Sequence, residues 1–426
     1  PHGATTTHQT KLSPPSDTIS MWIAYHEGLI AIATFLFIHL ATSVKVFSPE
    51  CNSTFLRDAD SCQSGSPTIL FPTINLEEFQ NASLPRKIEI ADALDRAMTT
   101  TGFFYLEGHG VDSETIKTLR EATARFHDRD ISYKQGYRAK VYATEGYNPY
   151  GLELQRRTQQ DHESVEGTTS HEIDLKDMNE WFKYVAYEGD ELELKESNLP
   201  KEFRNAIQAY MCAMQALTTD LHQLASFALH LTDPHVRRNL TDGAASPEKY
   251  LNDNIIEAHF HSIDDEQHHV REGQVAAETD LRSFISLRLT NYFSLSDADA
   301  ASGAYRIGEH DDYLGFTILS AGSVNGLQAH ASGKWHDLRT HPDTFIINAG
   351  LIISHMTNGH WKAAKHRVAA VSTERRISTP AFTAPGLGKI ISPFKRCAAC
   401  NAEPFKFPRI SVAEHYSEMK SAAFTY

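Results

Sequence analysis

The sequence predicts an α+β fold that is mainly β in its C-terminal half, with helices from the first half packed around an antiparallel sandwich or barrel. Two observations carry this prediction. Apolar residues recur at helical spacing in the first half of the chain. From Phe284 onward, short alternating segments are separated by Gly, Asn and Pro turns, a pattern typical of such a sandwich or barrel. The chain has 426 residues, 41% of them apolar, which is enough for one large core or two ordinary ones.

Composition divides the N-terminal end into three segments: a polar leader over 1–27, a hydrophobic segment over 28–46 and a linker over 47–69. Residues 28–44 carry no formal charge, and their length falls at the short end of a membrane span and beyond a typical signal-peptide core. A buried helix is the alternative, and His39 favours it. Lys45 and Arg57 favour leaving everything downstream in the cytoplasm. We therefore expect a cytoplasmic protein, with membrane attachment through residues 28–44 left open.

Residues 70–200 are expected to form an N-terminal region in which one strand lies between two helices. Pro72 to Phe79 has the pattern of a short strand that runs into a helix start. Leu84 to Gly102 shows helical spacing with the glycine as a stop signal, and the apolar strand FFYLEGHGV follows. A second amphipathic helix opens at a cap formed by Ser113, and a polar middle stretch comes after it.

A long helix is predicted over 201–234, where Lys201 to Leu231 shows a broad apolar face. The segment 235–282 that follows is polar and acidic and contains four histidines, His259, His261, His268 and His269. No strand or helix is predicted there that would fix the four rings as metal ligands. We therefore interpret this segment as a solvated insertion.

The β core is expected over 283–390, followed by a C-terminal tail over 391–426. The predicted strands are FISLRLTNYF, LGFTILS, GLQAH, KWHDL, TFIINAG, HRVAAVS and RRISTPAF.

Charge and cysteine usage exclude two classes of protein. The net charge of -14 and the absence of a Lys/Arg cluster argue against a nucleic-acid partner. Five cysteines are too few and too scattered for a disulfide scaffold, so a reduced core is expected. Cys397 and Cys400 have the spacing of half a zinc site. No second pair completes the site, and we interpret them as two ordinary thiols in a loop.

The stretch GEHDDYLGFTIL places His310 and Asp312 two residues apart. On an extended backbone such residues share a face, so Asp312 is expected beside His310 and Asp311 is expected to point the other way. His366 opens a later alternating segment and could supply a second imidazole from a neighbouring strand. Two histidines and one carboxylate form the facial triad of non-haem Fe(II) oxygenases. A second H-x-D, His341-Pro-Asp343, lies in a proline turn and is interpreted as a loop.

Arg376 and Ser378 share one face of a later apolar strand. A guanidinium on an interior face is costly unless it meets an anion, and a ligand carboxylate would be the natural partner for the arginine and the hydroxyl. An arginine on the solvent face of an edge strand is the alternative.

The order H-x-D, HRV, R-x-S resembles the Fe(II)/2-oxoglutarate-dependent dioxygenases of the isopenicillin N synthase-like group, which have a double-stranded β-helix (jelly-roll) core. FPTINLEEF, TGFFYLEGHGV, LRLTNYF, INAG and MTNGHWKAAKHRV are similar to further motifs in family order, so the resemblance covers residues 70 to 420. The sequence departs from the pattern at Leu351, where relatives commonly have an acidic residue, and in the long segment before the β core. Both departures bear on substrate choice rather than on the proposed ligands.

The resemblance implies Fe(II) bound by His310, Asp312 and His366. It also implies 2-oxoglutarate held through its distal carboxylate, with ascorbate as an optional reductant. The implied residues for 2-oxoglutarate are Arg376 and Ser378, with Tyr292 and Asn291 on the adjacent strand. The implied reaction is hydroxylation or desaturation of a small-molecule substrate with O2, giving succinate and CO2, by a monomeric enzyme. Two alternatives stay open: an Fe(II)/O2 oxidase that does not use 2-oxoglutarate, and a non-catalytic binding protein. The intact triad argues against the second alternative.

Overall fold

The computed structural model describes residues 71–140, 145–150, 178–189, 199–261, 281–301, 305–401 and 403–423. The hydrophobic segment 28–46 and the linker 47–69 lie outside the described residues. Among the helices within the described ranges, none is both long enough and apolar enough to cross a membrane.

The N-terminal region has the predicted order of strand, helix, strand, helix. It consists of β1 (Thr73–Asn75), α2 (Leu76–Asn81), α3 (Leu84–Thr100), β2 (Phe103–Glu107), α4 (Ser113–His127) and α5 (Ile131–Gln135). The break after α3 falls at Gly102, which has a φ of +74° and would bring a Cβ to 2.7 Å from the carbonyl oxygen of Lys362. The cap of α4 differs from the prediction. It is Asp112, whose side chain accepts a hydrogen bond from the backbone N–H of Thr115.

The polar middle stretch contains two strands that the sequence pattern did not reveal, β3 (Gly146–Asn148) and β4 (Asn179–Tyr187). β4 pairs along its whole length with the first strand of the C-terminal half, from Asn179 opposite Tyr292 to Tyr187 opposite Phe284. The hydrogen bonds of β4 therefore depend on a strand that lies far away in the sequence.

The long helix is confirmed as α6 (Lys201–His230). The interpretation of 235–282 as a solvated insertion is wrong for its first part, which forms α7 (Pro234–Thr241), α8 (Glu248–Leu251) and α9 (Ile255–His261). Leu240, Tyr250, Ile256 and Phe260 are buried in the main hydrophobic core, and α8 and α9, which carry the last three, pack against α6. These few apolar side chains are too widely spaced to stand out in a polar segment. His268 and His269 lie outside the described residues.

The C-terminal half is a jelly roll of two facing sheets. Its strands and helices are β5 (Phe284–Tyr292), α10 (Asp297–Ala301), β6 (Tyr305–His310), β7 (Phe316–Ser320), β8 (Leu327–Ala331), β9 (Lys334–Asp337), β10 (Phe345–Ala349), α11 (Leu351–Met356), β11 (His366–Ala369) and β12 (Arg376–Ala384). The larger sheet has the order β1-β2-β10-β7-β12-β5-β4-β3, and the smaller one has the order β6-β11-β8-β9. The predicted antiparallel arrangement is thus confirmed, and the first half of the chain adds four strands to the larger sheet. β6 is a further strand that the pattern did not reveal.

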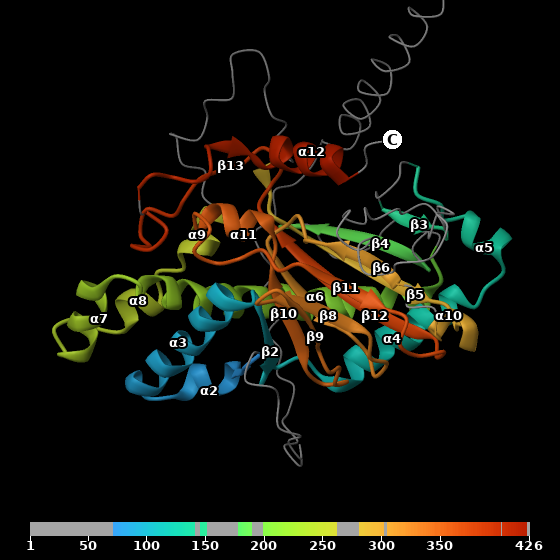
Figure 1. The fold of residues 1–426 in the computed structure, drawn as a ribbon, viewed down its shortest axis with the longest axis horizontal. Coiled ribbons are helices and arrows are strands. Elements are labelled where there is room, and N and C mark those ends of the chain that lie inside the picture. The colour runs from blue at the N-terminus through green and yellow to red at the C-terminus, as the bar shows by residue number, and fades with distance from the viewer. Residues whose placement is uncertain are drawn as a thin grey trace, which may run out of the picture. The chain divides into compact units, whose positions relative to one another are not determined.

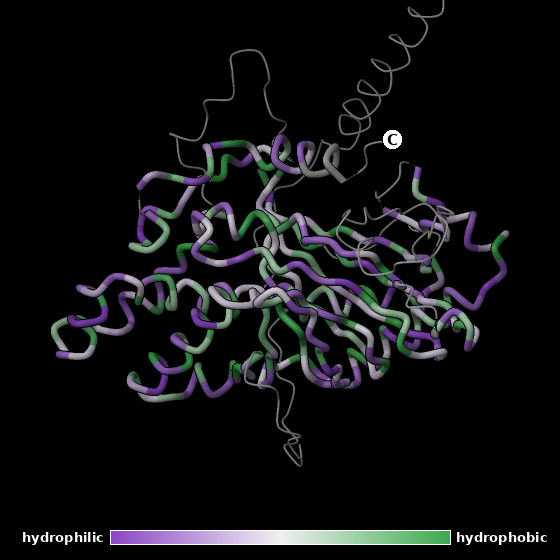
Figure 2. Tube along the Cα trace, in the orientation of Figure 1, coloured by the Kyte–Doolittle hydropathy of each residue, from purple (hydrophilic) through white to green (hydrophobic). Residues whose placement is uncertain are grey.

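Helices cover the outer face of the larger sheet. α4 contacts β5 and β12, and α6 contacts β5; Figure 1 shows α6 running behind these strands, with α3 and α4 both below it in this view. Figure 2 shows the hydrophobic residues gathered along the central strands, whereas the outer loops are mostly hydrophilic. Both faces of the larger sheet are therefore buried, which is why β5, β7 and β10 have almost no exposed residues.

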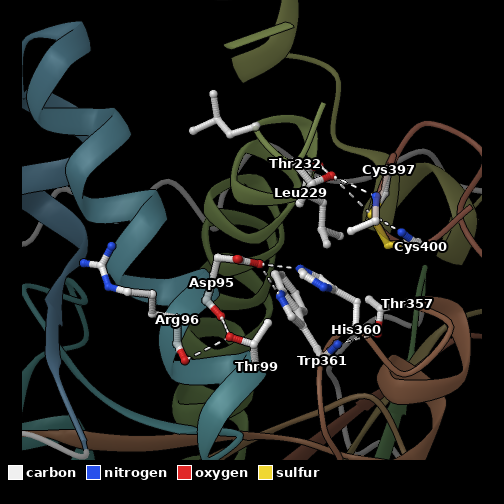
Figure 3. Close-up of polar contacts among 12 residues, drawn as sticks. Asp95, Arg96, Thr99, Leu229, Thr232, Thr357, His360, Trp361, Cys397 and Cys400 are labelled. Atoms are coloured by element: carbon white, nitrogen blue, oxygen red, sulfur yellow. Dashed lines mark hydrogen bonds and ion pairs between the residues drawn. A yellow bond between two sulfur atoms is a disulfide. The ribbon is translucent and has the colours of Figure 1, made fainter. Parts of the chain in front are cut away.

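The C-terminal segment forms β13 (Ile390–Ile391), β14 (Ile410–Ser411) and α12 (Val412–Ala423). Here the expectation of two ordinary thiols is wrong, because Cys397 and Cys400 form a disulfide and both are fully buried. A turn brings their Cα atoms to 5.2 Å, within disulfide reach. Figure 3 shows the pair beside Thr232, whose hydroxyl lies 3.7 Å from Cys397 Sγ.

Candidate active site

A cavity lies between the two sheets and is lined by the inward-facing residues of both. On β5 and β12 these are alternate residues, Thr290 and Tyr292 on one strand and Arg376 and Ser378 on the other. The smaller sheet contributes His310 and His366 among others. The cavity therefore contains six of the seven side chains that the sequence singled out.

The two histidines lie side by side because their strands pair. His310 ends β6, His366 begins β11, and the two are partners in the strand register with ring centroids 4.2 Å apart. Nδ1 of His310 lies 2.9 Å from the carbonyl oxygen of Gly308, and Nδ1 of His366 lies 2.8 Å from that of Ala364. A carbonyl oxygen can only accept, so each Nδ1 carries the proton. Both Nε2 atoms consequently keep a lone pair for a metal ion.

The carboxylate of Asp312 faces both rings. Its Oδ1 lies 4.0 Å from His310 Nε2 and 3.8 Å from His366 Nε2, and the three ligand atoms lie within 4.8 Å of one another. Its Oδ2 accepts hydrogen bonds from the Thr317 hydroxyl at 2.5 Å and from Asn348 Nδ2 at 2.8 Å. Burial raises the pKa of the Asp312 carboxyl, but the positive charge of His366 and His310 in their protonated forms and these two hydrogen bonds outweigh burial and lower the pKa.

This donor set fits a divalent iron ion. Two neutral imidazoles and one ionised carboxylate on one side of a metal ion are the facial triad of non-haem Fe(II) enzymes. Oδ2 of Asp312 and the Nδ1 atoms of both histidines are already hydrogen-bonded, so the surrounding groups hold the three ligands in orientation. The sequence patterns did not single out Thr317 or Asn348 as residues of the site. Asn348 lies in the INAG motif, and that motif was the one signal that could have identified it.

Asp311 was predicted to point away from the site, but its side chain does not do so fully. β6 ends at His310, so strict alternation stops there, and Asp311 borders the same cavity. Burial raises the pKa of its carboxyl. The cluster of ligand atoms in the described part of the chain nevertheless contains Asp312 and not Asp311.

The loop that carries Asp312 is held by the start of α11. The N–H groups of Gly350, Leu351 and Ile352 donate to the carbonyl oxygens of Gly315, Asp312 and Leu314 at 2.7, 2.8 and 3.2 Å. A Cβ at position 350 would meet the carbonyl oxygen of Leu314 at 2.3 Å. The glycine of INAG is therefore required by the close approach of two backbones.

The segment before His366 is anchored to α3. His360 Nε2 and Trp361 Nε1 both donate to Oδ1 of Asp95 at 2.8 Å, and the Trp361 backbone N–H donates to the Thr357 hydroxyl. Figure 3 shows the two rings converging on this one carboxylate. These contacts explain the NGHW motif structurally, because they fix the approach of the chain to β11.

Arg376, Ser378 and Tyr292 lie together in the part of the cavity wall that β5 and β12 form. The Arg376 side chain is 1% exposed; its Nε donates to the carbonyl oxygen of Val324 at 3.2 Å, and its guanidinium carbon lies 4.8 Å from the Tyr292 ring centroid. Nη1 is buried and has no hydrogen-bond partner among the described residues. The alternative of a solvent-facing arginine is thus excluded, and a buried cation with a spare donor fits a ligand carboxylate.

Asn291 does not join this group, which corrects the expectation for that residue. It alternates with Tyr292 and therefore faces the helices behind the sheet, where its Nδ2 donates to Glu180 at 2.9 Å and its Oδ1 accepts from Arg375 at 2.6 Å. Glu180 is buried and also binds Lys134 at 2.8 Å. Asn291 thus belongs to a polar cluster behind the cavity.

His341 and Asp343 are exposed and lie in a loop, as predicted.

Two family models match the chain. Residues 71–191 match the N-terminal domain described as non-haem dioxygenase in morphine synthesis, and residues 284–385 match the 2OG-Fe(II) oxygenase superfamily. Among curated proteins, a probable iron/ascorbate oxidoreductase of Dictyostelium discoideum is 26% identical over 336 residues, which cover 74% of this chain and 81% of that protein. An oxoglutarate-dependent flavonoid 7-O-demethylase of Ocimum basilicum is 24% identical, covering 83% of this chain and 79% of that protein.

Solved structures show the same fold. The structure of full-length Neurospora crassa T7H in complex with alpha-KG and thymine has a TM-score of 0.60 at 18% identity, covering 83% of this chain and 97% of that chain. JOX2 in complex with 2OG, Fe and JA has a TM-score of 0.58 at 20% identity, covering 87% and 92%. The two matched family models span about half of the sequence between them. The chain therefore belongs to the 2OG-Fe(II) oxygenase superfamily and is an Fe(II)- and 2-oxoglutarate-dependent dioxygenase.

Proposed function

We propose that this dioxygenase hydroxylates or desaturates a small molecule at an iron ion held by His310, Asp312 and His366. One observation carries the assignment of these ligands. The two Nε2 atoms and one carboxylate oxygen converge within 4.8 Å on the wall of the cavity that also contains Arg376. The catalytic region in this proposal runs from residue 70 to residue 390, and Tyr416 of the C-terminal tail adds to the lining of the cavity.

The iron and 2-oxoglutarate, when bound, supply the oxidative chemistry, in which one oxygen atom oxidises the co-substrate to succinate and CO2. The residues of the chain bind and orient the co-substrate and the metal ligands. Arg376 and Ser378 hold the distal carboxylate of 2-oxoglutarate, and the Tyr292 ring packs against the guanidinium. Thr317 and Asn348 hold Oδ2 of Asp312 in place by donating hydrogen bonds to it. The surrounding apolar wall excludes water from the site.

The test is succinate formation from 2-oxoglutarate under Fe(II), ascorbate and O2. His310→Ala, Asp312→Asn and His366→Ala should each abolish it and also abolish Fe(II) binding measured anaerobically. His341→Ala is the matched control, because His341 is exposed in a loop, and it should behave as the wild type. Oxygen consumption without succinate would favour the oxidase that does not use 2-oxoglutarate. Failure to bind Fe(II) would leave the non-catalytic alternative.

For its cellular setting, we propose a monomer in the cytoplasm, with residues 28–44 as the candidate for membrane attachment. The support is the uncharged run and the basic residues that follow it. Fractionation of the full chain and of a variant lacking residues 28–44 tests the attachment. A full chain that stays in the supernatant would contradict it.

A further inference from the structure

A buried arginine near the start of β6 carries a charge that no acidic residue of the described ranges neutralises. Arg306 is 1% exposed, and neither its Nε nor its Nη1 has a hydrogen-bond partner among the described residues. No carboxylate in the same part of the chain forms an ion pair with it. A buried cation without an anion is costly. We therefore expect Arg306 to serve an anion nearby or to hold part of the chain in place.

The Nη2 atom of Arg306 holds the turn that leads into β12. It donates to the carbonyl oxygens of Ser372 at 2.7 Å and of Glu374 at 2.5 Å. Both residues lie in the segment 370–375, which connects β11 to β12. Glu374 precedes Arg376 by two residues, and β12 begins at Arg376. The contact therefore fixes the backbone immediately before the arginine of the cavity wall.

Arg306 and Arg376 also belong to the same region of the fold. The backbone carbonyl oxygen of Arg306 accepts a hydrogen bond from Asn179 Nδ2 at 3.2 Å. Asn179 is opposite Tyr292 in the strand register, and Tyr292 is opposite Arg376. The two arginines influence each other electrostatically, because burial lowers the pKa of Arg306 and the positive charge of Arg376 lowers it further.

Two positive charges therefore share this region, and each has a buried nitrogen atom without a hydrogen-bond partner among the described residues. Like charges in a buried region repel each other, whereas an anion close to both is attracted by both. Arg376 belongs to the cavity lining, and Arg306 does not. Arg306 can thus act on an anion in the cavity through its charge and through the position of Arg376, without touching the anion.

We propose that Arg306 is a positioning residue of the 2-oxoglutarate site, which holds Arg376 in place and adds a second positive charge near it. The distal carboxylate of 2-oxoglutarate then interacts with two charges, one through direct hydrogen bonds and one at longer range. This inference rests on the proposed function, because it assigns Arg376 to that carboxylate. Its consequence is selectivity: Arg306 increases the preference for an oxo acid that has a second carboxylate over one that lacks it.

The experiment measures equilibrium binding to the full chain with Fe(II) by anaerobic calorimetric titration, so that no turnover occurs. The two probes are 2-oxoglutarate and 2-oxopentanoate, which has a methyl group in place of the distal carboxylate and is otherwise the same. The measured quantity is the ratio of the two dissociation constants. The wild type should bind 2-oxoglutarate about 100-fold more tightly or better, as expected for hydrogen bonds between charged groups.

Two substitutions separate the charge of Arg306 from its hydrogen bonds. Arg306→Gln keeps an N–H donor for the turn but removes the charge. It should lower the preference for 2-oxoglutarate about 5- to 30-fold, the order expected for a buried unit charge within about 10 Å. Arg306→Lys keeps the charge and should stay within about threefold of the wild type. Arg306→Met replaces Arg306→Gln if that variant fails to fold, and it should lower the preference at least as much.

Arg375→Gln is the matched control, because Arg375 is the neighbouring cation of the same turn and its charge is already paired with Asp128 at 2.6 Å. It should retain the full preference. An equal loss of affinity for both oxo acids in Arg306→Gln would show a purely structural role and overturn the proposal. An unchanged preference in Arg306→Gln, or an equally large loss in Arg306→Lys, would overturn it as well.

Arg376→Met keeps this inference and the proposed function apart. The variant should lose the preference for 2-oxoglutarate. A full preference in Arg376→Met would reject the proposed co-substrate site, whatever Arg306→Gln does. Loss of the preference in Arg376→Met but not in Arg306→Gln would reject only the role of Arg306.

Discussion

Asn348 Nδ2 lies 2.8 Å from Oδ2 of Asp312, while Oδ1 of the same carboxylate lies 3.8 Å from His366 Nε2. The two oxygens therefore have different environments. One is held by hydrogen bonds from β7 and β10, and the other faces the imidazoles. An amide far along the chain thus sets the direction in which Asp312 can bind a metal ion.

Removing either hydrogen bond to Oδ2 should weaken metal binding without removing a ligand. We expect Thr317→Val and Asn348→Ala to raise the dissociation constant for Fe(II) about 10- to 100-fold, as is usual for groups that orient metal ligands. Anaerobic equilibrium titration measures this change. Thr317→Ser retains the hydroxyl and should stay close to the wild type. Unchanged affinity in both Thr317→Val and Asn348→Ala would contradict the orienting role.

The two neighbouring aspartates should respond differently to the same change. Asp312→Asn replaces a charged ligand oxygen and should abolish tight Fe(II) binding and succinate formation. Asp311→Asn should leave Fe(II) binding largely intact, because Asp311 borders the cavity without joining the ligand cluster of the described residues. Titration of both variants with Fe(II) measures the two affinities. The reverse order of effects would shift the register of the H-x-D motif by one residue.

Arg376 and Ser378 should control the affinity for 2-oxoglutarate. Losing a charge-assisted hydrogen bond in Arg376→Met should raise the KM for 2-oxoglutarate about 10- to 100-fold, and Ser378→Ala should raise it by about tenfold or less. Arg376→Lys should recover little, because an ammonium lacks the planar fork. Initial rates of succinate formation provide the measurement.

Asn291→Ala separates the two faces of β5. Its side chain binds Glu180 and Arg375 behind the sheet, so the variant should lose unfolding free energy and keep a KM for 2-oxoglutarate close to that of the wild type. A raised KM at unchanged stability would return Asn291 to the co-substrate site.

Gly350→Ala should disturb the iron site although residue 350 is no ligand. The new Cβ would meet the carbonyl oxygens of Leu314 at 2.3 Å and of Asp312 at 2.9 Å, so the ligand loop must move. We expect a loss of about 1–3 kcal/mol in unfolding free energy, as for overpacked sites, together with weaker Fe(II) binding. Chemical denaturation and metal titration measure the two effects. Gly136→Ala, at a helix end outside the cavity lining, is the control and should change neither by as much.

Glu180 should make stability depend on pH in the acid range. It is 2% exposed; burial acts to raise its pKa, but His127, Lys134 and Tyr147 outweigh burial and lower the pKa to about 2 from its ordinary value of 4.5. A lowered folded-state pKa gives stability that is fully present above pH about 4.5 and is lost as the pH falls through about 2. The contribution is on the order of 3 kcal/mol.

Urea unfolding of the wild type and of Glu180→Gln at several pH values measures this contribution. The stability difference between the two proteins should shrink as the pH falls from 4.5 toward 2. Glu114→Gln, at an exposed position of α4, serves as the comparison and should show a much smaller change over the same range. A difference for Glu180→Gln that stays constant throughout would contradict the assigned pKa.

Sequence alone determined the features that depend on neighbours along the chain. Helical spacing identified α3, α4 and α6, and alternation identified most strands of the jelly roll. Alternation also placed Arg376 and Ser378 on one face. These predictions succeed because a helix or strand exposes a fixed periodicity that a few consecutive residues reveal. The order H-x-D, HRV, R-x-S then indicated the family.

Tertiary structure decided what depends on distant partners. β4 is a strand because β5 supplies its hydrogen bonds, and Asn348 belongs to the site because β10 and β7 pair. The direction of Asn291 follows from the register of β5 against β4, and the burial of Tyr250 and Phe260 follows from packing on α6. A local pattern contains no information about which remote segment will pair with it. Long-range pairing therefore fixed the orientation of the ligands and the identity of the buried residues.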